Sequence, residues 1–301
     1  MHPYPPPEID WEWYFDAFVS AFCPLIVPAV GLLIASIIIV RKTKGERRLT
    51  LLVAAVSIAF VWPLLPWPVV AHARDAARRT ACRNNLQAIA DAVLEFHNEH
   101  TQLPAPAVSV EQGAPASWRV DLLQYVPADL PRYGNAPSYS IVAADYDRTS
   151  PWDASANLSI AQRQAQLYRC PANATPQDSQ LRWFTAYAFL TGPGTAFPEA
   201  GPLTFDDITD GTSNTLLVVE ACGRNIVWTE PRDVDVSREA IAINSPGAQP
   251  GTSDGILSSY HKRGAQAALS DGSVRMLSAE MDASVLRALT TVAEGDAAGE
   301  F

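Results

Sequence analysis

Residues 49–100 read LTLLVAAVSIAFVWPLLPWPVVAHARDAARRTACRNNLQAIADAVLEFHNEH, and this stretch decides the fold. Its first part, residues 49–71, is apolar and long enough to cross a bilayer, which takes roughly 20 apolar residues. Its second part, residues 72–100, is polar but has apolar side chains at helical spacings of 4, 3, 4 and 3, namely Cys82, Leu86, Ile89, Val93 and Phe96. We therefore expect one long helix that crosses the membrane and continues as an amphipathic spine with one buried face.

A second apolar stretch, residues 18–40, contains no charged side chain and predicts another transmembrane helix. The loop between the two, residues 41–48, reads RKTKGERR, and five of its eight residues are basic. Cytoplasmic loops are enriched in Lys and Arg, so we expect this loop in the cytoplasm and residues 1–17 and 72–301 on the extracytoplasmic side. Arginines after the second stretch favour the opposite orientation, but they are less dense. The sequence thus predicts a two-helix, multi-pass protein of the cell membrane.

The charge of the chain is distributed unevenly. The formal net charge is −10, yet the first 71 residues carry five basic and five acidic side chains, so the whole excess belongs to the later domain. An acidic domain lacks the basic face that nucleic-acid binding requires. We therefore expect the membrane as a partner, with other envelope proteins, and no nucleic acid.

The domain at residues 72–301 is predicted to have an α+β fold. The spine helix should end near His100, because prolines follow within a few residues. Runs rich in aromatic and β-branched residues predict strands at 181–190 and 216–220, with a further candidate at 225–229. We expect the spine helix, residues 72–100, to pack on an antiparallel sheet made from these strands and a hairpin.

That hairpin is predicted within residues 260–278. Two apolar runs flank Asp271-Gly272, and Asp-Gly between such runs favours a tight turn with positive φ. A two-residue loop would pair Leu269 with Val274 and Ala267 with Met276. In this register His261 lies at the open end of the hairpin, away from the turn, so His261 and Asp271 should not share a metal ion.

Other groups of polar side chains have simpler interpretations than a metal site. His97, Glu99 and His100 match no metal-binding spacing and indicate a solvated helix end. The acidic residues between 206 and 220 do not match a calcium-binding loop and favour helix caps and turns; they are Asp206, Asp207, Asp210 and Glu220. The cysteines show no CxxC or other zinc-ligand spacing. We therefore expect no metal, no cofactor and no catalytic residue.

Four stretches together resemble a known family. They are DAARRTACRNNLQAIADAVLEFHNEH at 75–100, YRCPAN at 168–173, ITDGTSNTLLVVEACGRNIVWTEPRDV at 208–234, and His261 with Asp271-Gly272 as an H-x9-D-G motif. They are similar to a large bacterial family of pilin-like proteins of unknown function, related to type IV pilins and pseudopilins, with a prepilin-type H-x9-D-G C-terminal domain. The resemblance implies a pilin-like fold in which the motif residues are structural: Cys170, Pro171, Asp210, Gly211, His261, Asp271 and Gly272.

The same resemblance implies a place for the cysteines. Cys82 lies on the apolar stripe of the spine, and the Cys-Pro segment with Cys170 should pack near it in a pilin-like fold. A Cys82–Cys170 disulfide is one expectation. A Cys170–Cys222 disulfide and free buried thiols are the two alternatives.

These observations lead to three hypotheses about function. The first is a membrane-anchored, extracytoplasmic, non-enzymatic structural or assembly protein. The second is an extracytoplasmic module that binds a polysaccharide, a peptide or a partner protein. The third is a metal-dependent enzyme, for which the sequence offers the least support.

Overall fold

The computed structural model of the protein describes residues 67–108, 115–127, 138–163, 165–174, 176–247, 252–261 and 263–295. The chain divides into two compact units, residues 1–77 and 78–301. Of the first unit only the beginning of one helix is described. The N-terminal segment, the first expected membrane helix and the basic loop, residues 1–48, lie outside the described residues, as do residues 49–66 of the second expected helix.

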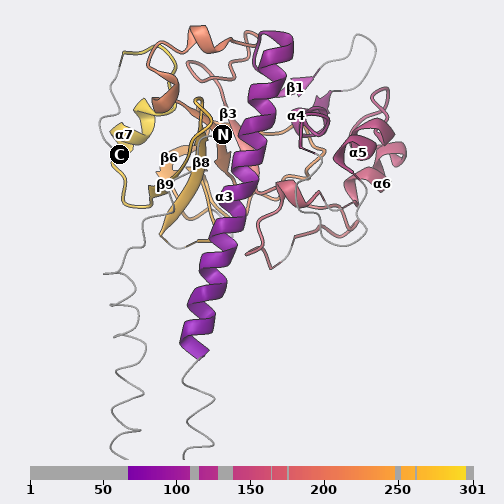
Figure 1. The fold of residues 1–301 in the computed structure, drawn as a ribbon, viewed down its shortest axis with the longest axis horizontal. Coiled ribbons are helices and arrows are strands. Elements are labelled where there is room, and N and C mark those ends of the chain that lie inside the picture. The colour runs from indigo at the N-terminus through magenta and orange to yellow at the C-terminus, as the bar shows by residue number, and fades with distance from the viewer. Residues whose placement is uncertain are drawn as a thin grey trace, which may run out of the picture. The chain divides into compact units, whose positions relative to one another are not determined.

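The spine helix α3 runs from Trp67 to His100, so its predicted end is confirmed. From residue 78 onwards it lies along the body of the second unit (Figure 1). The predicted stripe faces inward: Cys82, Leu86, Ile89 and Val93 are completely buried and Phe96 is partly buried. The N–H of Thr101, which has a φ of 57°, donates to the carbonyl oxygen of His97 at 2.7 Å and ends the helix.

The central sheet has five strands in the order β5-β3-β4-β8-β9. Neighbouring strands β3, β4, β8 and β9 pair antiparallel, whereas β5 pairs parallel to β3. The strands are β3 (Tyr187–Thr191), β4 (Leu216–Glu220), β5 (Val234–Asp235), β8 (Gly264–Leu269) and β9 (Val274–Ser278).

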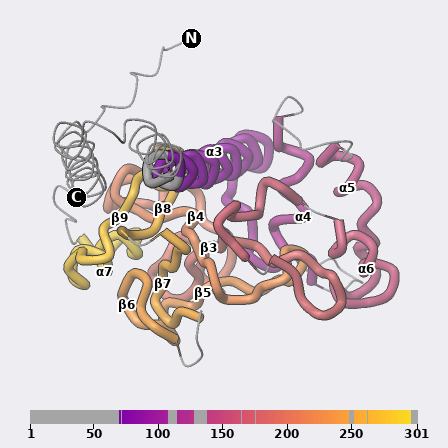
Figure 2. The backbone as a smooth tube through the Cα atoms, turned by 90° about the horizontal axis from the view of Figure 1, so that it is seen from below, coloured from indigo at the N-terminus to yellow at the C-terminus, as the bar shows by residue number. Residues whose placement is uncertain are grey.

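The two faces of this sheet belong to two separate apolar cores. Because side chains alternate along a strand, Tyr187 and Phe189 of β3 join the core with α3, while Ala188 and Leu190 join the opposite core. The opposite face is covered by α7 (Ala283–Ala288) and by the parallel pair β6 (Ala240–Ile243) and β7 (Gly255–Leu257), as Figure 2 shows.

Short elements precede the first strand of the sheet, and two 3₁₀ helices lie in the connection between β3 and β4. Trp118, Tyr139, Ile160 and Tyr168 from these elements extend the core that α3 covers. The elements are β1 (Ala107–Val108), β2 (Ala116–Ser117), α4 (Trp118–Leu122), α5 (Tyr139–Asp145), α6 (Ser155–Ala161) and the 3₁₀ helices η2 (Gln166–Tyr168), η3 (Phe205–Asp207) and η4 (Thr212–Asn214).

The expected fold class requires correction in two respects. The sheet is mixed rather than antiparallel, because β5 returns alongside β3 in the same direction. Among the residues that the structure describes, no helix is long and apolar enough to cross a membrane, so the two expected transmembrane helices are not seen. Residues 67–71, the end of the second expected span, belong to α3, which carries Arg74, Asp75 and Arg78 soon afterwards.

The hairpin of β8 and β9 is where the sequence predicted it, but its register is shifted by one residue. Ala268 pairs with Val274 and Gln266 with Met276. The loop has three residues, because the N–H of Leu269 donates to the carbonyl oxygen of Ser273. Within this loop Gly272, at a φ of 84°, occupies the left-handed position. The one-residue shift changes which side chains share a face, and Met276 is 43% exposed.

Candidate functional site

Four buried side chains that can each ligate a metal converge between α3 and the sheet. Cys82 comes from α3, Cys170 from the turn after η2, Glu220 from the end of β4, and His261 from the segment before β8. None is more than 2% exposed. One ligand atom from each lies within 4.8 Å of the other three. We call these four residues the Cys-Glu-His cluster.

The sulfur atoms of Cys82 and Cys170 are in direct contact. The thiol of Cys82 donates to Sγ of Cys170 at 3.2 Å, and Sγ of Cys82 lies 3.7 Å from Nε2 of His261. Cys222 is buried beside them, and all three cysteines are free thiols. The structure thus brings together the pair for which a disulfide was predicted, as well as its rival Cys170–Cys222.

Local structure explains how each side chain reaches the cluster. Cys82 is the first residue of the inward stripe of α3. On β4, Glu220 follows Val218 by two positions, so the side chains of Val218 and Glu220 both project toward the α3 side of the sheet. The Cys-Pro segment is held by a turn, in which the N–H of Asn173 donates to the carbonyl oxygen of Cys170 at 3.1 Å. The Asn244 amide donates to the carbonyl oxygen of His261 at 3.3 Å and fixes its backbone.

Ionisation in the cluster is governed by mutual contact and burial. Hydrogen bonds from Cys222 and Cys82 lower the pKa of Cys170, whereas the hydrogen bond to Cys170 and burial raise the pKa of Cys82 and of Cys222. Burial raises the pKa of Glu220 to about 7. Of the three buried thiols, that of Cys170 therefore most readily becomes a thiolate.

The Glu220 carboxylate is only partly satisfied. Its Oε2 accepts the N–H of Gln266 at 2.8 Å. Its Oε1 is buried and makes no hydrogen bond within the described residues, although the Ser259 hydroxyl is near enough to lower the pKa of the carboxyl. A buried carboxylate oxygen without a donor is costly, and a cation is one group that could satisfy it.

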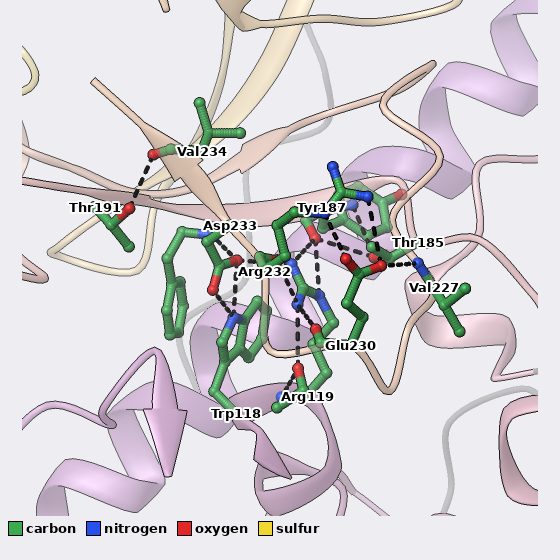
Figure 3. A network of polar contacts seen from close by, with 12 residues as sticks. Trp118, Arg119, Thr185, Tyr187, Thr191, Val227, Glu230, Arg232, Asp233 and Val234 are labelled. Carbon is green, nitrogen blue, oxygen red and sulfur yellow. Dashed lines mark hydrogen bonds and ion pairs between the residues drawn. The ribbon is translucent and has the colours of Figure 1, made fainter. Parts of the chain in front are cut away.

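A second buried polar group, the Arg119–Asp233 network, lies on the same side of the sheet (Figure 3). Nη2 of Arg119 pairs with Oδ1 of Asp233 at 2.7 Å, and both side chains are nearly inaccessible. The indole N–H of Trp118 donates to both oxygens of Asp233 at 3.0 Å, and Oδ1 also accepts the N–H of Phe189 at 3.0 Å. Arg119 donates to the carbonyl oxygen of Tyr187 through Nε at 3.1 Å.

This network has a structural role. It joins α4 to β3 and to the start of β5, and the ring of Trp118 stacks on that of Phe189 at a centroid distance of 3.9 Å. Burial raises the pKa of Asp233, while the Arg119 guanidinium and the Trp118 indole oppose that rise. Each charged group of the network meets an opposite charge or several hydrogen bonds. The network therefore leaves no unsatisfied charge for a ligand to pair with.

Pro171 directly follows Cys170 of the cluster, whereas the motif residues Asp210, Gly211 and Asp271 have other roles. Asp210 accepts the N–H groups of Glu294 at 3.0 Å and Gly295 at 2.9 Å, and so holds the chain after α7. Gly211, at a φ of 99°, forms the turn before η4. Asp271 is exposed in the hairpin loop, where its carboxylate accepts the N–H of Ser273 at 2.8 Å. His261 is thus separated from Asp271 and placed with the cysteines instead.

The acidic and histidine-rich stretches largely have the simple roles that the sequence indicated. Asp207 forms a capping box with Thr204 at η3. Nε2 of His100 lies 2.8 Å from the Tyr125 hydroxyl, and the ring of His97 packs on Phe205 at 4.4 Å. Glu220 is the exception, because it is buried in the cluster and not part of a turn. The alternation of side chains in the predicted strand 216–220 would have placed Glu220 on one face, but not beside a cysteine.

Comparison with known proteins identifies the family. The model of the family SBP_bac_10, described as "Protein of unknown function (DUF1559)", matches residues 71–284. This match covers more than half of the 301 residues, so the chain belongs to the DUF1559 family. No curated protein and no solved structure matches the chain.

Proposed function

We propose that the protein is a pilin-like structural or assembly component on the extracytoplasmic side of the cell membrane, and not an enzyme. The arrangement of α3 is the observation that carries this proposal. One face of the helix is completely buried against the sheet, whereas the opposite face is exposed over many turns, at Arg83, Asn84, Asp91, Glu95 and Asn98. A spine helix with one free face can pack against a neighbouring protein without any change in its own domain.

The distribution of charge and hydropathy supports the location. The residues before α3 are apolar with balanced charge, and the net charge of −10 belongs to the domain that follows. The four family-like stretches at 75–100, 168–173, 208–234 and 261–272 also resemble pilin-like proteins. The pilin relationship and the membrane association both belong to this proposal.

The free face of α3 gives a direct experiment. A photo-crosslinking amino acid at Arg83 or Asn84 should form adducts in the native bacterium, either with a second copy or with another envelope protein. The same amino acid at Arg287 is the matched control, because Arg287 is exposed on α7 rather than α3. Mass spectrometry of the adducts identifies the partner. If neither α3 position gives more adducts than Arg287 does, the α3 face is not an assembly surface and the proposal is wrong.

A further inference from the structure

We propose that Cys82, Cys170, Glu220 and His261 bind one structural zinc ion that fixes α3 to the sheet. This inference goes beyond the proposed assembly function and does not depend on it. It rests on the identity of the donors, on their separations, and on what surrounds them.

The donor set is one that zinc prefers. Zn²⁺ in structural sites takes four ligands from Cys, His and Asp or Glu in tetrahedral geometry. The cluster supplies two sulfurs, one imidazole nitrogen and one carboxylate oxygen, one from each of its four residues. Magnesium and calcium favour sites made of oxygen alone, so the two cysteines argue against both.

The separations suit one ion. With zinc–sulfur bonds of about 2.3 Å, a tetrahedral ion places two sulfur ligands about 3.8 Å apart. The Sγ atoms of Cys82 and Cys170 are 3.2 Å apart, and Sγ of Cys82 is 3.7 Å from Nε2 of His261. All four donor atoms lie within 4.8 Å of one another. Shifts of roughly half an ångström in each donor atom therefore bring the set onto a tetrahedron around a central ion.

The surroundings favour a positive charge. The ionisable groups that act most strongly on Cys82, Cys170 and Glu220 are other members of the cluster together with Cys222 and Tyr187, and no arginine of the described residues is among them. Oε1 of Glu220, in this buried position, accepts no hydrogen bond from the residues that the structure describes. A divalent cation satisfies that oxygen and neutralises two thiolates, which a hydrogen bond alone does not.

The site is closed and therefore structural. Every donor is buried, and four protein ligands leave no open position for a substrate or water. Binding forms two zinc–sulfur bonds, one zinc–nitrogen bond and one zinc–oxygen bond, it releases the two thiol protons and the water ligands of the ion to solvent, and no electron is transferred. The ion joins four segments that are far apart in sequence, so it holds α3 against β4 and against the segment before β8. Cys222 stays outside the ligand set as a neighbour of Cys170.

The experiment measures metal in the full-length chain, purified anaerobically in detergent. We expect one zinc per chain by mass spectrometry of the elements, and a lower melting temperature after chelation that added Zn²⁺ restores. Replacement by Co²⁺ should give intense tetrahedral absorption bands and a sulfur-to-cobalt charge-transfer band of two thiolates. Cys170→Ser and His261→Gln should lose the zinc. Cys222→Ser is the matched control, a buried thiol beside the site, and should keep it.

Three outcomes would overturn the inference. One is a chain that carries no zinc as isolated and takes up neither Zn²⁺ nor Co²⁺. Another is a Cys82–Cys170 disulfide in protein from cells whose thiols were blocked at lysis. The third is a metal content that falls as far in Cys222→Ser as in Cys170→Ser, while the metal content of Glu220→Gln stays that of the unaltered chain. If a ligand variant fails to fold, the cobalt spectrum and the chelator-dependent melting of the unaltered chain still decide the matter.

Discussion

Two buried polar groups lie on the same side of the sheet, and they are satisfied in opposite ways. In the Arg119–Asp233 network a guanidinium pairs with a carboxylate at 2.7 Å, and the carboxylate oxygens also accept hydrogen bonds from further N–H groups. In the Cys-Glu-His cluster the four ligand atoms face one another, and within the described part of the chain Oε1 of Glu220 has no hydrogen bond. The first group is complete without any added ion. The second has the composition of a metal site, and this difference identifies it as a site for a cation.

The largest expected effect comes from breaking the complete network. Asp233→Asn leaves the buried Arg119 guanidinium without its counter-charge, which typically costs about 3–5 kcal/mol of the free energy of unfolding. Asp235→Asn is the matched control, because Asp235 pairs with Arg238, whose side chain is 82% exposed, and such pairs are worth about 0–1 kcal/mol. Urea denaturation of the full chain, followed by circular dichroism, compares the two. Equal costs would contradict the structural role given to the network.

A smaller effect is expected from removing one hydrogen bond of the same network. Trp118→Phe keeps an aromatic ring on Phe189 but removes the indole N–H from Asp233, for an expected loss of about 1–3 kcal/mol. Trp183→Phe removes an indole N–H that donates to the carbonyl oxygen of Gln162 at an accessible position. The control should cost less than about 1 kcal/mol in the same denaturation experiment. A larger loss in Trp183→Phe than in Trp118→Phe would mean that the hydrogen bond from Trp118 does not stabilise the buried Asp233 carboxylate.

The smallest effect is expected at the cluster once metal has been removed. In the chelated chain, Glu220→Gln keeps an acceptor for the N–H of Gln266 and eliminates a buried carboxylate that lacks a full set of partners. We expect a change of less than about 1 kcal/mol in the free energy of unfolding. The measurement is urea denaturation with chelator present throughout. A loss as large as that of Asp233→Asn would show that the two groups are alike after all.

Local patterns in the sequence predicted much of the fold. The 3.6-residue period of Cys82, Leu86, Ile89 and Val93 gave the buried face of α3, because that period depends only on neighbouring turns. The run 216–220 gave β4 in full, and Asp271-Gly272 located the hairpin. Its register was wrong by one residue, because Asp-Gly suits both a two-residue loop and the three-residue loop that forms.

Other predictions failed where contacts between residues distant in sequence decide the bounds of a strand or the direction of its pairing. The strand expected at 181–190 begins only at Tyr187, and the stretch 225–229 contributes an isolated bridge between Val227 and Phe184 rather than a strand. The mixed sheet follows from β5, which is two residues long and carries no periodic signal. Asp233, directly before β5, is held by Arg119 from a different part of the chain, and this ion pair has no sequence signature.

The sequence by itself determined the long helix, its inward stripe, the hairpin position and the membership of the motif stretches in one family, because these depend on short-range periodicity and on local turn chemistry. Only the tertiary structure decided that Cys82 meets Cys170 across 88 residues and His261 across 179. No spacing rule detects donors that come from four separate segments. They converge because α3, β4, the Cys-Pro turn and the segment before β8 pack around the same core.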